Sequence, residues 1–142
     1  MSPTIPASSG RVLIVDDQEN WRETLSELLR ADGQDVMVAA SLAEARALFA
    51  SNAFDVAIVD IRLLDERRYD IQGLRFLDEI HQSGLATRTL VLTGYAPPGT
   101  ELRIRELGVE TLTLKSPPEG FSIVDFRKTV RALVQEARHS PR

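Results

Sequence analysis

The sequence has no cysteine, no long apolar run and only two lysines among its 17 basic residues. Without cysteine there are no disulfides, no thiolate metal ligands and no thiol nucleophile. No apolar stretch approaches the roughly 18 residues that a membrane-spanning helix needs, so a membrane partner is not expected. Segment 1–10 lacks the basic and then apolar composition of a signal peptide. We therefore expect a flexible lead-in to a cytoplasmic protein.

The composition is that of an ordinary globular protein of one domain. Its 142 residues are enough to bury a core, and 43% of them are hydrophobic. Charged residues make up 27%, and the net charge of −4 argues against a nucleic-acid-binding surface spread over the whole domain. We therefore expect one domain that does not itself bind nucleic acid.

Short apolar runs alternate with segments of helical periodicity along the chain. The runs predict strands at 12–15, 36–40, 56–59, 90–92 and 111–114. After each run, apolar residues at intervals of three and four predict a helix. The expected apolar faces are Trp21, Leu25, Leu28 and Leu29; Leu42, Ala45, Leu48 and Phe49; Leu74, Phe76, Leu77 and Ile80; a shorter segment over 100–107; and Phe126, Val130, Leu133, Val134 and Ala137.

Local signals mark several helix ends. Ser41 and Glu44 have the Ser-x-x-Glu spacing of a capping box, which favours a helix start there. Gly33 and Gly108 follow the first and fourth helical patterns and are expected to stop them.

The βαβαβαβαβα order predicts an α/β fold, a doubly wound five-stranded parallel sheet with helices on both faces. The first and third strands are almost wholly apolar, as central strands are, whereas the fifth alternates, as an edge strand does. This favours the flavodoxin-like strand order 2-1-3-4-5, in which strands one and three are neighbours.

Polar residues follow four of these strands directly. Asp16 and Asp17 follow the first, Asp60 the third, Thr93 ends the fourth and Lys115 follows the fifth. Ligands of such folds bind beyond the carboxyl ends of the strands, so we expect these five side chains to converge. Each one alone is more often a turn residue, a helix cap (Asp17) or a surface charge. Their common position at one edge reverses that preference.

Three crowded carboxylates repel one another, and a hard divalent cation such as Mg²⁺ relieves that repulsion. One aspartate can then act as a nucleophile toward a phosphoryl donor and form an aspartyl phosphate. A lysine ammonium and a hydroxyl group would neutralise and bind the transferred group. The residues themselves therefore indicate phosphoryl chemistry.

With these residues placed, the sequence resembles the response-regulator receiver family over about 11–137. The resemblance rests on VLIVDD at 12–17, DVAIVD at 55–60, LVLTG at 90–94 and LTLK at 112–115. It implies a receiver domain over 11–138, with 1–10 as lead-in and 139–142 as a tail. It also implies a phosphoacceptor switch of a two-component system rather than a turnover enzyme, one that takes part in its own phosphoryl transfer and dephosphorylation.

The family also implies roles for the site residues. Asp60 would be the phosphoacceptor, Asp17 would bind Mg²⁺ (or Mn²⁺) directly, Asp16 would bind it through water, and the backbone carbonyl of Arg62 would supply another ligand. The phosphoryl donor would be a histidine kinase or a histidine phosphotransfer protein.

The remaining family roles concern output. Thr93 would be the switch hydroxyl and Lys115 its ion-pair partner, and the signal would pass through the face of the fourth and fifth helices to an output domain or partner. A homodimer stays open, since the last helix covering its own core explains its apolar stripe as well.

Three features depart from the family pattern. The segment 61–72 is longer and more charged than the loop that usually follows the phosphoacceptor. Leu112 stands where the family has its switch aromatic, and Ser116 separates Lys115 from the proline that usually follows it. These departures keep open an alternative, a docking module on the same fold that works independently of phosphorylation.

Two other functions of similar folds are disfavoured. A haloacid dehalogenase phosphatase needs a second aspartate two residues after its nucleophile, where this chain has Arg62. A flavin-binding protein needs a phosphate loop after the first strand, where Asp16 and Asp17 would repel a phosphate.

Overall fold

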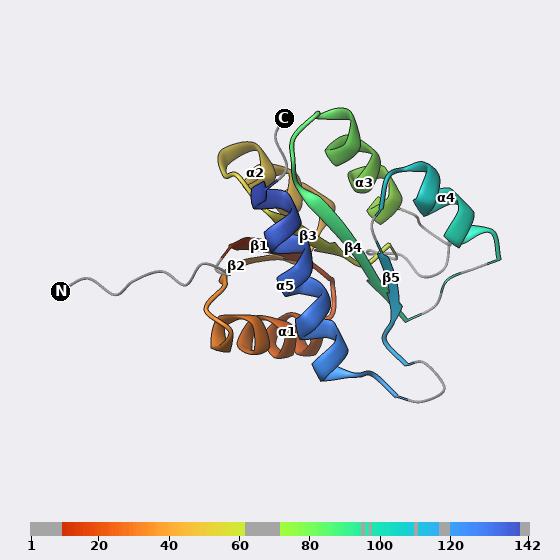
Figure 1. Ribbon diagram of the computed structural model, residues 1–142. Coiled ribbons are helices and arrows are strands. Elements are labelled where there is room, and N and C mark those ends of the chain that lie inside the picture. Colours follow the sequence, from red (N-terminus) through yellow and green to blue (C-terminus); the bar gives the residue numbers. More distant parts are fainter. Residues whose placement is uncertain are drawn as a thin grey trace.

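The computed structural model describes residues 10–61, 72–94, 96, 98–109, 111–116 and 120–139. Within these ranges strands and helices alternate from β1 to α5 (Figure 1). Their bounds are β1 Arg11–Val15, α1 Glu19–Ala31, β2 Asp35–Ala39, α2 Leu42–Ser51, β3 Val56–Val59, α3 Gln72–Gln82, β4 Arg88–Thr93, α4 Thr100–Glu106, β5 Thr111–Leu114 and α5 Ile123–His139.

The strands form one sheet in the order β2-β1-β3-β4-β5, and every neighbouring pair is parallel. The predicted flavodoxin-like order is therefore confirmed. All four residues of β3 are buried, whereas the residues of β5 are half-buried, as expected for a central and an edge strand. The apolar run of β1 and β3 is long enough for burial on both faces, which is why these strands lie in the middle.

Two hydrophobic clusters cover the two faces of the sheet. In β1, Leu13 and Val15 belong to one cluster and Val12 and Ile14 to the other, because successive strand residues point to opposite faces. Helices α2, α3 and α4 contribute to the first cluster, and α1 and α5 to the second. Figure 1 shows this three-layer arrangement, with α1 and α5 together on one side of the sheet.

The local signals at the helix ends work as predicted. The Ser41 hydroxyl accepts a hydrogen bond from the Glu44 N–H (3.2 Å), and the Glu44 carboxylate accepts one from the Ala40 N–H (3.0 Å). Gly33 and Gly108 adopt φ angles of 85° and 80° just after α1 and α4, a left-handed conformation that glycine adopts without steric cost.

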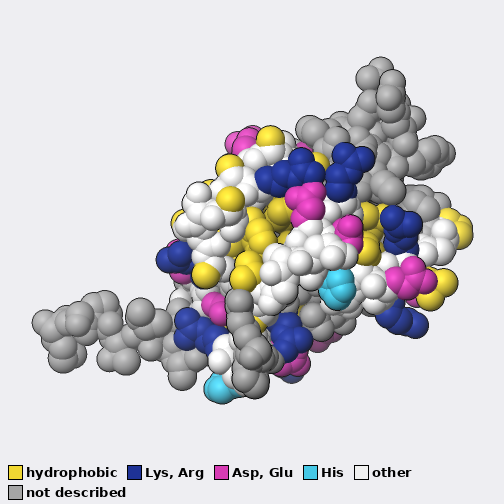
Figure 2. All heavy atoms as spheres, turned by 90° about the horizontal axis from the view of Figure 1, so that it is seen from above, with side chains coloured by type: hydrophobic (Ala, Val, Ile, Leu, Met, Phe, Trp, Pro, Cys, Tyr) yellow, Lys and Arg dark blue, Asp and Glu magenta, His cyan; other side chains and the backbone are white. Residues whose placement is uncertain are grey.

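Ion pairs tie the helices to one another within each layer. Arg46 of α2 pairs with Glu79 of α3, and Arg127 of α5 pairs with Asp32 at the end of α1. Figure 2 views the layer of α2, α3 and α4, where side chains of both signs are mixed over the surface. In the part of the chain that is described, no helix combines the length and the apolar character that crossing a bilayer requires.

Some predicted details differ from the structure. Strand β4 begins at Arg88, two residues before the expected apolar run, because Arg88 and Thr89 continue the pairing with β3. Leu48 and Phe49, expected in the core, are half-buried and pack against the cluster from its margin. The helix α2 therefore presents a narrower buried face than its sequence predicts.

Candidate functional site

The parallel register brings the carboxyl ends of the strands together. Val15 of β1 is the partner of Val59 of β3, so Asp16 and Asp60 leave the sheet side by side. The Asp60 N–H donates to the Val15 carbonyl (2.9 Å), and the Lys115 N–H donates to the Thr93 carbonyl (2.9 Å). The backbone hydrogen bonding of the sheet therefore continues one residue past the strands. It fixes the backbone of Asp60 and Lys115, two of the predicted site residues.

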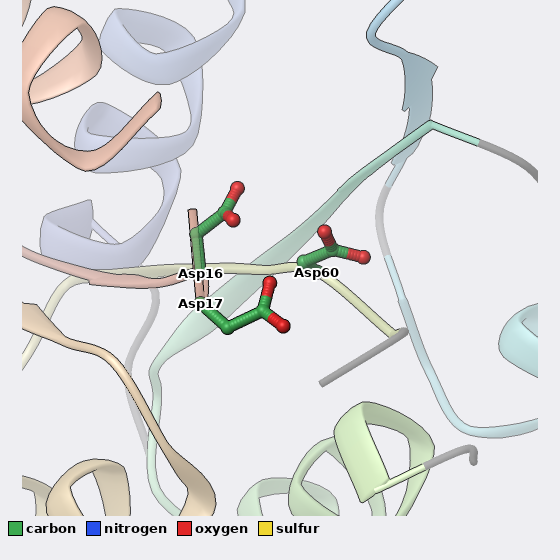
Figure 3. A group of neighbouring side chains, drawn as sticks. All are labelled: Asp16, Asp17 and Asp60. Carbon is green, nitrogen blue, oxygen red and sulfur yellow. The ribbon is translucent and has the colours of Figure 1, made fainter. Parts of the chain in front are cut away.

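Asp16, Asp17 and Asp60 form one carboxylate group. A ligand oxygen from each of the three lies within 4.8 Å of the others. Figure 3 shows Asp16 and Asp17 leaving the end of β1 and Asp60 the end of β3, with their carboxylates gathered in one region. Asp16 and Asp60 are buried, and Asp17 is the more exposed of the three. Hard oxygen ligands in this number suit Mg²⁺, which takes a few carboxylates and keeps some of its water.

Lys115 lies in the same cluster and is only 6% exposed. Its ammonium nitrogen is 2.8 Å from Asp16 Oδ2 and 3.0 Å from Asp60 Oδ2. It also donates to the side-chain oxygen of Gln18 (2.8 Å). These three acceptors use all three N–H groups of the ammonium, so the lysine bridges the two buried carboxylates as their nearby cation.

Thr93 lies on the other side of Asp60. Its hydroxyl donates to Asp60 Oδ1 (3.0 Å), and the residue is fully buried. Asp60 therefore accepts from Thr93 on one carboxylate oxygen and from Lys115 on the other. A group attached to either oxygen would begin beside one of these two donors.

Asp16 is held by several groups at once. Burial raises the pKa of its carboxyl above the ordinary value, while the hydrogen bonds from Lys115 and from the Gln18 N–H act in the opposite direction. The Gln18 N–H donates to Asp16 Oδ1 (2.9 Å), and the Arg22 guanidinium donates to the Asp16 backbone carbonyl (2.8 Å). A divalent cation nearby would favour the charged form of this carboxylate further.

Gln18 and Trp21 take part in the site without having been predicted. Gln18 is the N-cap residue of α1, and its side chain reaches Lys115. The ring centroid of Trp21, in the first turn of the same helix, is 5.1 Å from Lys115 Nζ. Their nearness to the double aspartate in the sequence is a weak signal, and the apolar spacing of Trp21 indicated only a core position.

Gly73 is a third residue that the sequence analysis did not select. It follows the first residue of α3, and its N–H donates to the Ile61 carbonyl (3.2 Å). A methyl group at this position would overlap the backbone of Asp60 and Ile61. Only glycine therefore lets α3 approach the segment that carries Asp60 this closely.

The other predicted positions have mixed outcomes. Asp17 does not cap α1, because Gln18 is the N-cap residue and Asp16 accepts its N–H. Arg62, most of segment 61–72 and the residues of the proline pair after Ser116 lie outside the described residues. His81 and His139 are exposed and outside the carboxylate group.

Known proteins are similar to this chain in sequence and in fold. A family model described as the response regulator receiver domain matches residues 12–120. The chain is 30% identical to the response regulator protein PilR of Pseudomonas aeruginosa, over 84% of this chain and 30% of that protein. It is 28% identical to the regulatory protein AtoC of Escherichia coli, over 91% of this chain and 27% of that protein. The chain thus spans under a third of the length of these two relatives.

Solved structures share the fold. The receiver domain protein (CheY-like) from Methanospirillum hungatei superposes with a TM-score of 0.79 at 24% identity, covering 90% of this chain and 95% of that one. The response regulator protein TrrA from Thermotoga maritima, solved in complex with Mg²⁺-BeF, superposes with a TM-score of 0.71 at 28% identity. That match covers 87% of this chain and 97% of that one.

Proposed function

Because the chain belongs to the response regulator receiver domain family, a family of two-component signalling, we propose that Asp60 is its phosphoacceptor and that residues 11–138 form the receiver unit. The observation that carries this proposal is the position of Asp60. Its carboxylate accepts hydrogen bonds from both Thr93 and Lys115. Those are the two donors that a phosphoryl group on Asp60 would meet.

The reaction follows from the two oxygens of that carboxylate. One Asp60 oxygen attacks the phosphorus of a phosphohistidine, an O–P bond forms, and the P–N bond breaks with its electron pair going to the imidazole. The Thr93 hydroxyl donates to a phosphoryl oxygen, and the Lys115 ammonium offsets the negative charge. Attack of water on phosphorus later breaks the O–P bond and restores the carboxylate.

The carboxylate group fits a divalent cation. Asp17 would bind it directly and Asp16 through water, with the Arg62 carbonyl as a further ligand. When bound, Mg²⁺ or Mn²⁺ supplies positive charge to the phosphoryl oxygens. The structure of TrrA with Mg²⁺-BeF supports the binding of Mg²⁺ by similarity.

Partners follow from the family. The phosphoryl donor is a histidine kinase or a histidine phosphotransfer protein, and the signal leaves through the face of α4 and α5 to an output domain or partner. Regulatory relatives several times the length of this chain support such an output. Leu112 is half-buried where an aromatic switch residue usually stands, so the output mechanism differs from the usual aromatic rotation.

The test is the intact mass of the protein after incubation with acetyl phosphate, with Mg²⁺ or with EDTA. We expect a Mg²⁺-dependent gain of one phosphoryl group that hydroxylamine removes. Asp60→Asn should abolish the gain. Asp78→Asn, a change at an exposed carboxylate on α3, should leave it intact.

Two outcomes would contradict the proposal. A mass gain that survives Asp60→Asn would place the phosphoryl group elsewhere. No gain in folded wild-type protein with either acetyl phosphate or phosphoramidate would favour a docking module that works without phosphorylation. That module should bind its partner equally well as Asp60→Asn.

A further inference from the structure

Lys115 contacts an aromatic ring in addition to its three acceptors. Trp21 lies in the first turn of α1 and is half-buried, and its ring centroid is 5.1 Å from Lys115 Nζ. A cation within about 6 Å of an indole ring is attracted by the negative charge of the ring face. The indole therefore stabilises the ammonium at the place from which it reaches Asp16 and Asp60.

Trp21 also contacts the connection between β5 and α5. Its ring meets the Phe121 ring edge to face, with centroids 5.3 Å apart and an interplanar angle of 88°. Phe121 in turn meets Phe126, a buried residue of α5, at 5.6 Å. A continuous line of contacts thus runs from Lys115 through Trp21 and Phe121 to Phe126.

The start of α1 joins this line at two points. Gln18, the N-cap residue, accepts a hydrogen bond from Lys115, and Trp21 lies three residues further on the same helix. A change in the position of the ammonium therefore acts on one rigid element through two contacts. Asp16 and Asp17 directly precede the N-cap residue of this helix in the chain.

From these contacts we propose that Trp21 is a positioning residue for Lys115, and that the Trp21–Phe121 contact couples the position of the lysine to the start of α5. The proposal rests on the proposed phosphorylation of Asp60, whose product adds negative charge beside the ammonium. Lys115 then moves toward the phosphoryl oxygens, its contact with the indole changes, and Phe121 and the first turn of α5 respond. This route does not use position 112.

A purely structural role for Trp21 predicts something different. The residue also packs against the core cluster that α1 and α5 share, so any smaller side chain would lower stability there. Such a loss leaves the phosphorylation rate of the folded protein and the response of α5 unchanged. The test therefore has to separate ring electrostatics from ring size.

Trp21 is the only tryptophan of the chain, so fluorotryptophan incorporated during expression changes this one ring. Fluorination weakens the attraction between indole and cation while nearly preserving the size of the ring. We expect the Mg²⁺-dependent phosphorylation rate with acetyl phosphate to fall in steps as fluorine atoms are added, by roughly two- to fivefold in all. The phosphorylation rate of Trp21→Leu should be lower still. The rate of Trp21→Phe should lie between those of Trp21→Leu and wild type.

The coupling to α5 is tested by hydrogen exchange of segment 120–130, with and without Mg²⁺ and beryllofluoride. Wild type should show altered exchange there when beryllofluoride binds. Phe121→Leu, a change at the ring that contacts Trp21, should phosphorylate at the wild-type rate but lose most of this alteration. The control is Phe49→Leu, a change on the other face of the sheet.

Failure of the inference and failure of the proposed function look different. A wild-type protein that gains a phosphoryl group, with a rate indifferent to fluorination, overturns the positioning role of Trp21. An α5 response that survives in Phe121→Leu overturns the coupling. A folded wild-type protein that gains no phosphoryl group overturns the proposed function and the inference with it.

Discussion

Replacing Lys115 with methionine removes the cation between Asp16 and Asp60 and keeps a side chain of similar length. The ammonium lies 2.8 Å and 3.0 Å from the two carboxylate oxygens. At an effective dielectric constant near 20, each attraction amounts to about 5–6 kcal/mol before desolvation is subtracted. Measured losses on removing one partner of a buried ion pair are about 3–5 kcal/mol. We expect a loss of that size in the free energy of unfolding without Mg²⁺.

Mg²⁺ should reduce this loss. With the lysine gone, the carboxylates lose a cation that competes with the metal for their oxygens, so Mg²⁺ is expected to bind about tenfold more tightly to Lys115→Met than to wild type. That difference corresponds to about 1.4 kcal/mol of added stability at saturating Mg²⁺. The deficit of the variant should therefore shrink by about this amount.

The assay is urea unfolding at neutral pH, followed by circular dichroism, in EDTA and in excess Mg²⁺. Lys128→Met is the matched control, because Lys128 is the other lysine of the chain and is exposed on α5. Its change should stay within about 0.5 kcal/mol in both buffers. A Lys115→Met deficit that Mg²⁺ leaves unchanged, or one no larger than that of the control, would refute the idea that the lysine and the metal neutralise the same carboxylates.

Three further changes test other parts of the structure. Asp60→Asn removes one carboxylate of the group, so isothermal titration calorimetry should show Mg²⁺ binding at least about tenfold weaker. Mg²⁺ should also no longer raise the urea midpoint of unfolding appreciably. Unchanged Mg²⁺ binding would place the metal elsewhere. Gly73→Ala puts a methyl group into the backbone of Asp60 and Ile61, and we expect a loss of about 1–3 kcal/mol in unfolding free energy together with slower phosphorylation. Gly94→Ala, where the methyl group meets no atom within 4 Å, should keep its stability. The Arg127 guanidinium lowers the pKa of the Asp32 carboxyl below its ordinary value of 3.8. The ion pair therefore stabilises the folded state fully at pH values above 3.8. This stabilisation is lost as the pH falls through the lower pKa that Asp32 has in the folded state. Asp32→Asn should therefore unfold at lower urea than wild type at pH 7, and the gap should close in acid; a gap that persists at the lowest pH would exclude the ion pair as its cause.

The order of strands and helices could be predicted because the spacing of apolar residues within each short segment indicates both its secondary structure and which side is buried. The wholly apolar runs of β1 and β3 indicated central strands, and the alternation of β5 indicated an edge. Boundaries were less predictable. Arg88 and Thr89 extend β4 because β3 offers them backbone partners, which no property of those two side chains indicates.

Five members of the site were determined by the sequence alone. Asp16, Asp17, Asp60, Thr93 and Lys115 stand at strand ends, and a parallel sheet places all such ends along one edge whatever the details of packing. Only the tertiary structure decided which of them touch. It also added the contacts of Gln18, Trp21 and Gly73. Gln18 and Lys115 are 97 positions apart in the chain. Their contact depends on the angle at which α1 packs against the sheet. The whole core sets that angle, and no local sequence pattern does.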